Sequence, residues 1–528
     1  MAVQGQSDVD QLHRMGYAQE LLRRMSGFSN FAISFTIISI LSGCLTLFYF
    51  GMTNGGPAVI NIGWPFVGVM VLVVGLAMAE VCSSYPTAGG LYYWAAKLGG
   101  KSSAGWSWMT GWFNLLGQVA ITAGIDFGLA FFVNFFLSTL ISSWPSPLNA
   151  GTAFNSRLSI VGVYAVVLFI HGLLNTFGVR LVALLNDISV WWHIAGVTII
   201  VGVLFLFSKY HQSPSYVFTH FVNNTGFSFP LASLYVFLTG LLNAQYTFTG
   251  YDASAHLTEE THNAAVSGPR GIVWSIIISL AAGWVLLIGV TQAINDGDYV
   301  NIAGAAGAAP GVIFQEAIGT TGASLLLLIV IGAQFYCGMS SVTANSRMIY
   351  AFSRDGAVPG SEFWHRINPR TRTPTNSIWF AAVGAFILGL PYLWNPTAYA
   401  AVTSIAVIGL YIAYGIPILL RLLAGEKFQR GPWHLKGWSY VVGWVAVIWI
   451  AFISILFILP QAAPGNTLAT FNYAPLAVIV VLLFAGGYWF LSAKNWFKGP
   501  KVQGTPAELA AIERELEEVG SVVPATTG

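Results

Sequence analysis

Long uninterrupted apolar runs of about 20 residues recur along most of this sequence, and that length lets a helix cross a bilayer. The runs are too long and too continuous for the alternating strands of a membrane β-barrel. Only 8% of the residues are Asp, Glu, Lys or Arg, against roughly a quarter in a soluble protein. The sequence therefore predicts an all-α integral membrane protein and excludes a soluble enzyme. We expect twelve transmembrane helices, over residues 28–52, 58–83, 104–140, 158–179, 181–208, 229–256, 271–294, 321–347, 375–394, 397–420, 438–460 and 473–493.

The distribution of Lys and Arg predicts the orientation of these helices. The polar amino-terminal segment does not have the pattern of a cleavable signal peptide, so we expect the first apolar run to be retained as a helix. If the amino terminus is cytoplasmic, all of the 22 Lys and Arg except Arg157 and Lys209 lie on the cytoplasmic side. Because basic residues concentrate in cytoplasmic loops, we expect both termini to be cytoplasmic. Thr505 and Glu508 have the spacing of a capping box, which predicts a short helix in the carboxyl tail.

Charge, cysteines and motifs exclude other classes of protein. The net charge of +2 is too small to indicate a nucleic-acid partner. Cys44, Cys82 and Cys337 lie singly within apolar runs, so neither a disulfide framework nor a zinc site is expected. The sequence has no GxxxxGK[ST] loop for nucleotide hydrolysis and no HExxH motif. We expect no enzymatic activity, no metal and no cofactor, and the sequence leaves the oligomeric state undetermined.

Two of the expected spans, the first and the sixth, contain small and hydroxylated residues near their middle. These residues let a helix unwind in the membrane, where freed amides can bind an anion and freed carbonyls a cation. Five spans separate the two positions, and an odd offset gives the opposite orientations that two inverted repeats require. The alternative is that the small residues only allow close helix packing. The residues concerned are Ser39, Ser42 and Gly43 in SILSGC and Thr247, Thr249 and Gly250 in YTFTGYD.

Ionisable residues at membrane depth are candidates for function, because a charge in lipid is costly. His171 and Glu80 have structural hydrogen bonding as their stronger alternative, and Asp187 lies close enough to the cytoplasmic end to be hydrated. Glu259 and Glu260 follow the sixth span and either pair with cytoplasmic arginines in a gate or remain solvated loop charges. The residues at membrane depth are Glu80, Asp126, His171, Asp187, His193 and Asp252.

Five ordered motifs resemble the amino acid-polyamine-organocation superfamily of transporters. They are SILSGC, EVCSSYPTAGGLYYWAAKLGG, GWFNLLGQVAITAG, YTFTGYDASAHLTEE and TANSRMIYAFSRDGAVPGSEFW. The opening MGYAQELLRRMSGFSNFAISF and the FSRDGAVPGS…TRTPTN stretch are most similar to its amino acid/choline transporter branch. The resemblance implies the leucine-transporter-type fold, in which two inverted repeats of five helices work by alternating access. The segments it implies are a cytoplasmic amino-terminal segment 1–27, repeats 28–208 (helices 1–5) and 229–420 (helices 6–10), two added helices over 438–493, and a cytoplasmic tail 494–528.

The resemblance also implies a substrate site, because the unwound parts of helices one and six bind the substrate in this superfamily. Gln118 lies where relatives present a polar side chain to the site, and Asp126 would be an anionic residue of an outer vestibule. The superfamily has a Gly-Ser-Gly-like triplet in helix one, whereas this sequence has Ser42-Gly43-Cys44, so the resemblance defines the register only to within about one residue. The residues carried over from the two breaks are Ser39, Ser42, Gly43, Tyr246, Phe248, Thr249 and Gly250.

A histidine in the fifth span corresponds to a coupling position. Many sodium-independent relatives have a Lys six residues after an Asp-Ile pair, and here Asp187 precedes His193 by that spacing. His193 would replace a bound sodium ion and, since imidazole titrates near neutral pH, could carry a proton. Ser340 and Ser341 lie where sodium-coupled members have hydroxyl ligands. The alternative for His193 is a neutral core histidine.

Together these features predict a secondary transporter of the plasma membrane that carries a small amino acid or amine such as 4-aminobutyrate, either coupled to protons or independent of sodium. A choline or polyamine carrier is the alternative, because Tyr246, Phe248 and Tyr251 could form an aromatic cage. A sensor that does not transport is disfavoured, because the tail is short for an output domain. Glu80, Asp126 and Glu259 are the candidate vestibule and gate residues, and the lipid bilayer is the expected environment.

Overall fold

The computed structural model describes residues 7–177, 179–463, 467 and 471–521, and helices make up most of them. Among the described residues eleven helical segments are long and apolar enough to cross a membrane. The expected sixth span is not one of the eleven, because it is divided into α11 (Ala232–Gly240), α12 (Leu242–Thr247) and α13 (Ala253–His256). With this divided helix included, the all-helical membrane fold with twelve crossings agrees with the sequence prediction.

The first crossing is also divided, into α2 (Gly27–Ile38), α3 (Ile40–Thr46) and α4 (Phe48–Thr53). The other crossings are α5 (Gly56–Ser84), α7 (Ser103–Leu140), α8 (Phe154–Phe177), α9 (Val179–Phe207), α14 (Ala264–Gln292), α16 (Ala309–Arg354), α18 (Thr375–Gly389), α19 (Ala398–Ala424), α20 (Ser439–Leu456) and α21 (Ala474–Val481), which continues into two π-helical turns. The short helices are α1 (Asp8–Met15), α6 (Gly90–Leu98), α10 (Pro214–Thr219), α15 (Tyr299–Gly304), α17 (Ser361–Trp364), α22 (Lys494–Trp496) and α23 (Pro506–Ser521).

Helix α16 extends further than the sequence predicts. The expected span 321–347 matches its central part, but a further helical segment precedes it and joins it at Gly319. Gly319 has φ +77°, a left-handed conformation that glycine adopts without steric cost, so the two segments meet at a kink.

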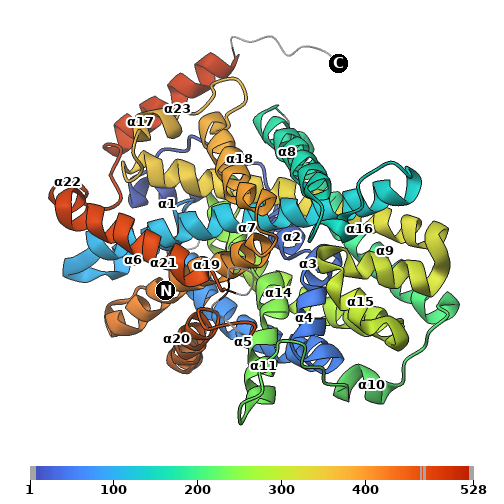
Figure 1. The fold of residues 1–528 in the computed structure, drawn as a ribbon. Helices are drawn as coiled ribbons and strands as arrows, with labels where there is room; N and C mark the ends of the chain where they lie inside the picture. Colours follow the sequence, from blue (N-terminus) through green and yellow to red (C-terminus); the bar gives the residue numbers. More distant parts are fainter. Residues whose placement is uncertain (1–6, 178, 464–466, 468–470, 522–528) are drawn as a thin grey trace.

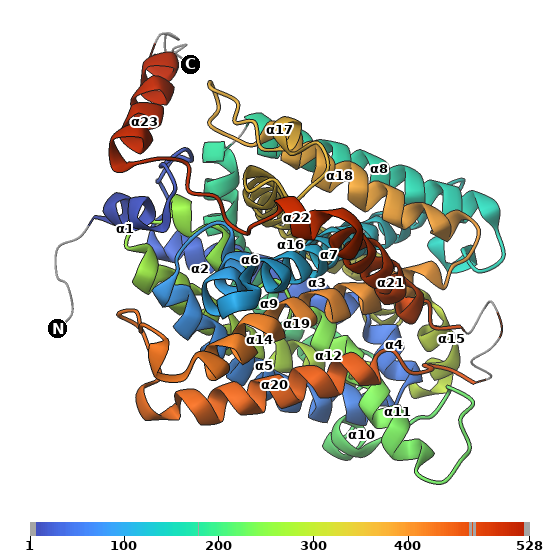
Figure 2. The same ribbon diagram turned by 90° about the vertical axis from the view of Figure 1, so that its left-hand side faces the viewer.

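Helices α2 and α3 of the divided first crossing lie inside the bundle, whereas α11 of the sixth lies at its edge (Figure 1). Helix α2 packs against α14, α9 and α16, and α7 packs against both α19 and α16. Figure 2 views the bundle from the side, with α1 and α23 at one end and α10 and α15 at the other. We call the end that carries α1 and α23 the tail end.

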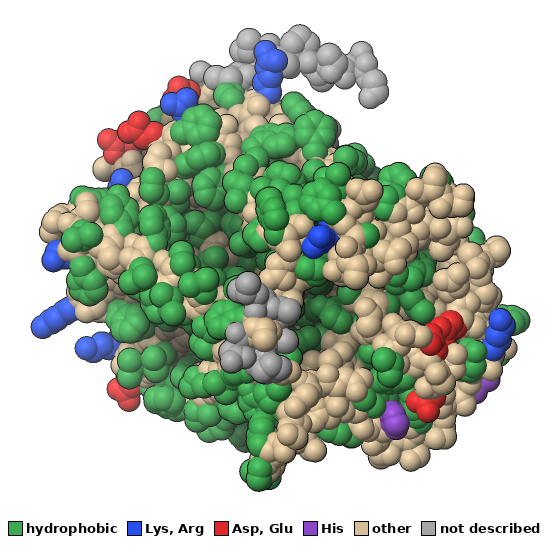
Figure 3. All heavy atoms as spheres, in the orientation of Figure 1, with side chains coloured by type: hydrophobic (Ala, Val, Ile, Leu, Met, Phe, Trp, Pro, Cys, Tyr) green, Lys and Arg blue, Asp and Glu red, His purple; other side chains and the backbone are tan. Residues whose placement is uncertain are grey.

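The outer surface of the bundle is apolar. Hydrophobic side chains cover much of the face in Figure 3, and Asp, Glu, Lys and Arg are sparse there. Large side chains such as Trp191, Leu206 and Leu491 are between 65% and 86% exposed. The interior instead holds many buried polar side chains, including Gln118, Asp126 and Asp252. A polar interior inside an apolar surface is the arrangement expected of a protein surrounded by lipid.

The predicted tail helix is present as α23. Thr505 donates its backbone N–H to Glu508 at 2.7 Å and the Glu508 N–H contacts the Thr505 hydroxyl at 3.4 Å, so the expected capping box forms. The helix is not simply solvated, because Leu509 is buried and the Glu513 carboxylate lies 2.8 Å from His13 Nε2 of α1. The two tails therefore contact each other.

Candidate functional site

The first helix is interrupted at Ser39, inside the segment that the sequence singled out, and again at Leu47 between α3 and α4. Ser39 separates α2 from α3 and has φ 44° and ψ 76°, a left-handed conformation that is unusual for a residue with a side chain. Its hydroxyl accepts a hydrogen bond from the Ser42 hydroxyl at 2.6 Å. Just before the break, the Ile37 carbonyl accepts from the Cys337 thiol of α16 at 3.1 Å. The interruption therefore exposes polar groups of helix one in the protein interior.

The sixth helix is interrupted over Phe248–Asp252, between α12 and α13. The Phe248 carbonyl accepts from the Tyr411 hydroxyl of α19 at 2.9 Å, and the Thr249 hydroxyl donates to the Tyr246 carbonyl at 2.6 Å. Gly250 has φ +87°, and a Cβ there would lie 2.1 Å from Ile37 Cγ2. Only glycine fits this position, because helix six passes directly against helix one.

A small enclosed cavity of about 10 Å³ lies between the two breaks. It has room for about one water molecule, so the site is closed in this structure. Of the predicted substrate residues, Ser42, Gly43, Tyr246 and Thr249 line this cavity, whereas Ser39, Gln118, Phe248 and Gly250 do not. Thr247, named in the sequence only as part of the second break, also lines the cavity. The sequence prediction missed the other lining residues, which are Ile37, Ile38, Thr46, Ile121, Ile125, Gln334 and Cys337.

Two polar atoms in the cavity wall have no hydrogen-bond partner among the described residues. They are the Tyr246 hydroxyl and Gln334 Oε1, and both are buried. A buried polar atom without a partner is costly, and a bound polar molecule would remove that cost. Gln334 is a polar residue in the middle of an apolar span, and this is the sequence signal that could have identified it.

His193 contacts the break in helix one. Its Nε2 lies 2.8 Å from the Ser39 hydroxyl and its Nδ1 lies 2.7 Å from the Ser189 carbonyl, so α9 is tied to the first helix. Ser340 does not contact the ring; it bonds to Asn186, which ties α9 to α16 instead. Ser341 bonds to Thr122 of α7 at 2.8 Å. The three predicted coupling residues therefore lie in neighbouring networks, without a hydrogen bond between the histidine and either serine.

Gln118 belongs to a buried cluster beside the second break. Its amide donates to Asp252 Oδ2 at 2.7 Å, and the Tyr414 hydroxyl donates to Asp252 Oδ1 at 2.8 Å. His256 lies one helical turn after Asp252, with its Nε2 3.3 Å from Oδ2. This cluster joins α13 to α7 and α19.

Asp126 is fully buried in this closed structure rather than exposed in a vestibule. Its carboxylate lies 3.2 Å from His171 Nδ1 of α8. A Cβ on Gly338 would lie 1.8 Å from Asp126 Oδ1, so α16 approaches the carboxylate through a glycine. The pair joins three helices on the side of the site away from the tails.

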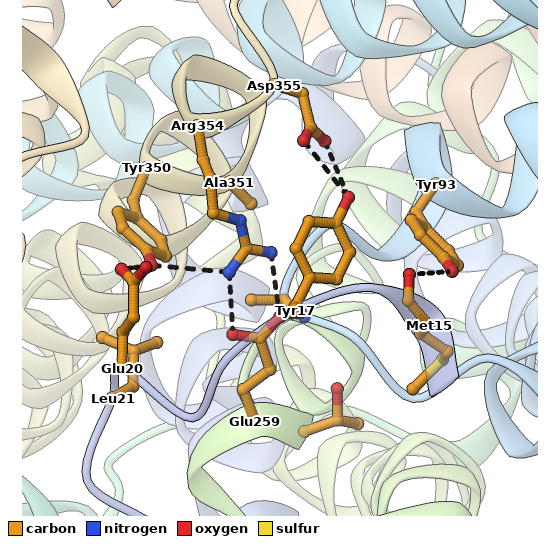
Figure 4. Close-up of polar contacts among 12 residues, drawn as sticks. Met15, Tyr17, Glu20, Leu21, Tyr93, Glu259, Tyr350, Ala351, Arg354 and Asp355 are labelled. Carbon is orange, nitrogen blue, oxygen red and sulfur yellow. Dashed lines mark hydrogen bonds and ion pairs between the residues drawn. The ribbon is translucent and has the colours of Figure 1, made fainter. Parts of the chain in front are cut away.

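At the tail end, ion pairs close the space below the second break. Glu259 lies 3.1 Å from Arg354, and Glu260 lies 2.7 Å from Arg347, so both acidic residues pair with arginines of α16. Figure 4 shows Arg354 between Glu259 and the ring of Tyr17, whose centroid is 3.8 Å from the guanidinium carbon. The amino-terminal segment therefore covers these pairs.

Asp355, which follows α16, extends this closure. Its carboxylate accepts from Tyr17 at 2.9 Å and from the Lys501 backbone N–H at 3.0 Å. Burial raises the pKa of the Asp355 carboxyl above its usual value, although Arg354 and these hydrogen bonds oppose the rise. The amino-terminal and carboxyl-terminal segments thus meet at one buried acid.

Glu80 lies in a separate ion pair at the same end. It accepts from Arg421 Nε of α19 at 3.0 Å, from the Leu435 N–H at 3.2 Å and from the Ser439 hydroxyl. These contacts join α5 to α19 and α20. They match the structural role that was the stronger alternative for Glu80.

Comparison with known proteins identifies one family and several similar proteins, all described as permeases. The family described as amino acid permease matches residues 25–484. The amino-acid permease BAT1 of Arabidopsis thaliana is 45% identical over 93% of this chain and 95% of its own length. The BAT1 homolog of Oryza sativa subsp. japonica is 43% identical over 93% of this chain and 94% of its own. The GABA-specific permease of Saccharomyces cerevisiae is 31% identical over 94% of this chain and 86% of its own. These names describe transporters rather than enzymes.

Proposed function

Since this chain belongs to the amino acid permease family, we propose that it carries a small amino acid or amine, such as 4-aminobutyrate, across the plasma membrane by alternating access. The observation that carries the proposal is the cavity between the broken helices, where the Tyr246 hydroxyl and Gln334 Oε1 have no partner among the described residues. A substrate with an amine and a carboxylate would supply a donor and an acceptor to these atoms.

The lining of the cavity supports an amino acid over a quaternary amine. No Lys, Arg, Asp or Glu lies among its lining residues, so hydroxyl and amide groups would recognise the substrate. Choline recognition would use an aromatic cage. Of the candidate rings only Tyr246 lines the cavity, because Phe248 packs on Trp64 at 4.3 Å and Tyr251 packs on Tyr414 at 5.2 Å. The name of the GABA-specific relative gives independent support to a small amino acid.

We further propose that transport is coupled to protons or independent of sodium. The hydroxyls of Ser340 and Ser341, the expected sodium ligands, are already bonded to Asn186 and Thr122. His193 would replace the cation by bonding helix one through Ser39. Sodium needs several free oxygen ligands, and this arrangement offers few.

The tail end is proposed to face the cytoplasm, following the distribution of Lys and Arg. The closed state would then be sealed on the inside by the pairs of Glu259 and Glu260 with α16. Opening would move one repeat, 28–208, relative to the other, 229–420, so that these pairs separate. The cavity would enlarge in the same movement and admit the substrate.

The test is uptake by the purified protein in proteoliposomes. A panel of labelled amino acids, 4-aminobutyrate, choline and polyamines is measured with imposed proton and sodium gradients. We expect uptake of one or a few small amino acids, without a sodium requirement. The variant Tyr246→Phe removes only the hydroxyl in the cavity and should raise the substrate KM, whereas Tyr235→Phe, far from the cavity, is the matched control.

Two results would reject the proposal. Uptake that follows a sodium gradient at constant pH would exclude the proposed coupling. Transport of choline or polyamines with no amino acid transported would exclude the proposed substrate class.

A further inference from the structure

Asp252 fastens the second half of helix six to the surrounding helices. It is fully buried and is the last residue of the break, two residues beyond Gly250. One carboxylate oxygen accepts from Tyr414 of α19 at 2.8 Å, and the other accepts from Gln118 of α7 at 2.7 Å. Movement of α13 away from these two helices must therefore break both bonds.

The orientation of His256 determines where its protons are. Nδ1 lies 2.9 Å from the Ala88 carbonyl, and a carbonyl only accepts hydrogen bonds, so Nδ1 carries a proton. The other ring nitrogen, Nε2, lies 3.3 Å from Asp252 Oδ2. In a neutral ring protonated on Nδ1, Nε2 is an acceptor that lies beside the carboxylate oxygen.

A buried carboxylate beside an unprotonated ring nitrogen has no cation to balance its charge, and a proton on Nε2 would balance it. Tyr414 and Gln118 already donate to the two Asp252 oxygens, so Nε2 is the group beside them that can take a proton. The Asn114 amide nitrogen lies 3.4 Å from Nε2 and can donate to it when the ring is neutral, whereas the Asn114 oxygen has no partner among the described residues. Turning this amide would let the oxygen accept from a protonated Nε2.

The other two fully buried histidines of the described chain need no extra proton. His193 donates from Nδ1 to the Ser189 carbonyl and can accept at Nε2 from the Ser39 hydroxyl, so a neutral ring is satisfied. His171 can donate from Nδ1 to Asp126, and its Nε2 has no partner among the described residues, so no acceptor there calls for a second proton. His256 differs from both, because its Nδ1 is bonded to a carbonyl while its Nε2 lies beside a carboxylate at the second break.

We propose that Asp252 and His256 together bind the transported proton. The inference rests on the proposed function, because it names the proton site of the same carrier. When the carrier is open to the outside, a proton from that side binds Nε2 of His256 and α13 stays fastened. When the carrier opens to the inside, water reaches Nε2 and the proton leaves to that side. No covalent bond other than that between the proton and Nε2 forms or breaks.

The structure also suggests how loss of the proton would be coupled to opening of the carrier. The unprotonated Nε2 repels Asp252, and movement of α13 relieves this repulsion by separating His256 from Ala88 or Asp252 from Tyr414 and Gln118. Ala88 also donates its N–H to Glu259 at 3.0 Å, so this loop binds both the proton site and an ion pair of the tail end.

Other titratable groups around the pair are either tyrosines or members of ion pairs. Helix α2 contributes only uncharged polar side chains here, and the one cation of α14, Arg270, is exposed. The nearby titratable groups are Tyr251, Tyr411 and Tyr414, together with the pairs Glu259–Arg354 and Glu260–Arg347. The pairs have their charges balanced, and this leaves Asp252 and His256 as the site for a mobile proton.

The experiment compares coupled accumulation with exchange in proteoliposomes that contain the full chain. The substrate is the labelled amino acid with the highest uptake in the panel, beginning with 4-aminobutyrate, and the membrane potential is clamped with potassium and valinomycin. For one proton per substrate, the parent should accumulate substrate up to about tenfold per pH unit, the ratio equivalent to about 1.4 kcal/mol. Exchange of internal for external substrate needs no net proton movement and reports on folding and binding.

Asp252→Asn removes the charge but can still donate to Nε2 and accept from Tyr414, so no extra proton is needed. We expect measurable exchange to persist while accumulation falls to a ratio near one, and the pH dependence of substrate affinity to flatten. His256→Gln removes the proton site from the other side of the pair and should give the same result. His193→Gln is the comparison variant, and it should keep the proton-driven accumulation ratio even if its rate is lower.

A variant that exchanges substrate and still accumulates it as the parent does would overturn the assignment. Where a variant is folded but does not transport, substrate binding is measured by tryptophan fluorescence across pH. A pH dependence of binding equal to that of the parent would also overturn the assignment. A parent without proton-driven accumulation would instead contradict the coupling in the proposed function. The two failures are therefore distinguishable.

Discussion

The contact between Gly250 and Ile37 permits a quantitative test of the broken helices. Gly250→Ala adds one methyl group at φ +87°, where a side chain costs about 1–2 kcal/mol. The added Cβ would also lie 2.1 Å from Ile37 Cγ2, and such overpacking costs typically about 1–3 kcal/mol. The second cost applies only while helices one and six are in contact, so it destabilises the closed state relative to open ones.

If transport passes through this closed state, the overpacking slows it. A cost of about 1–3 kcal/mol corresponds to a decrease in the exchange rate of about 5-fold to 150-fold. We expect the exchange rate of Gly250→Ala to fall within that range, measured with labelled substrate in proteoliposomes at equal protein content. Gly250→Leu should abolish exchange while size-exclusion chromatography still shows a folded protein.

Two further variants distinguish the effect of the Gly250–Ile37 contact from the effect of backbone strain. Gly319→Ala is the matched control, because Gly319 also has a left-handed φ of +77° but a Cβ there meets open space. It should lower thermal stability slightly and leave the exchange rate close to that of the parent. Ile37→Ala in the Gly250→Ala background removes the clashing methyl and should restore most of the lost rate. Normal exchange by well-expressed Gly250→Ala would refute the proposed contact in the transport cycle.

Three other perturbations follow from the structure. His193→Gln should slow uptake without flattening its pH profile, measured as initial rates across pH, and a flattened profile would return the proton to this histidine. Glu80→Gln should lower the midpoint of thermal unfolding, because it leaves the Arg421 charge buried without its partner at a cost of about 3–5 kcal/mol; an unchanged midpoint would contradict this. A single cysteine at Ser146 should react with an impermeant thiol reagent in intact cells, and one at Arg366 should react only after permeabilisation; the opposite pattern would reverse the proposed orientation.

The fold could be predicted from the sequence because membrane crossing depends on a local property. Eleven of the twelve expected spans are continuous apolar segments, and a window of about 20 residues is sufficient to identify each. The sixth was also recognised, although its helix is divided, because the apolar run continues through the break. The segment of α16 before Gly319 was missed, since Gly and Thr at residues 319–322 interrupt the apolar pattern.

The positions of the breaks were predictable, but the partners of the buried polar groups were not. Ser39 and Gly250 follow from residue type, because small residues tolerate unwinding. The partners of Asp252 lie 134 and 162 positions away in the sequence, on other helices. Nothing local identifies such pairs. His256, at the end of the expected sixth span, was not identified as a candidate for the same reason, since its bond to Ala88 appears only when the chain is folded.

The loop at Ala88 joins two features that the sequence presents separately. Its carbonyl accepts from His256 and its N–H donates to Glu259, so one peptide segment holds the histidine of the proposed proton site and an acid of the tail-end closure. Because Glu259 is paired with Arg354, displacement of this loop weakens a buried ion pair as well as the histidine contact. A buried charge that loses its partner is strongly destabilised. Departure of the proton and opening of the tail end would therefore occur as one cooperative movement, rather than as two independent steps.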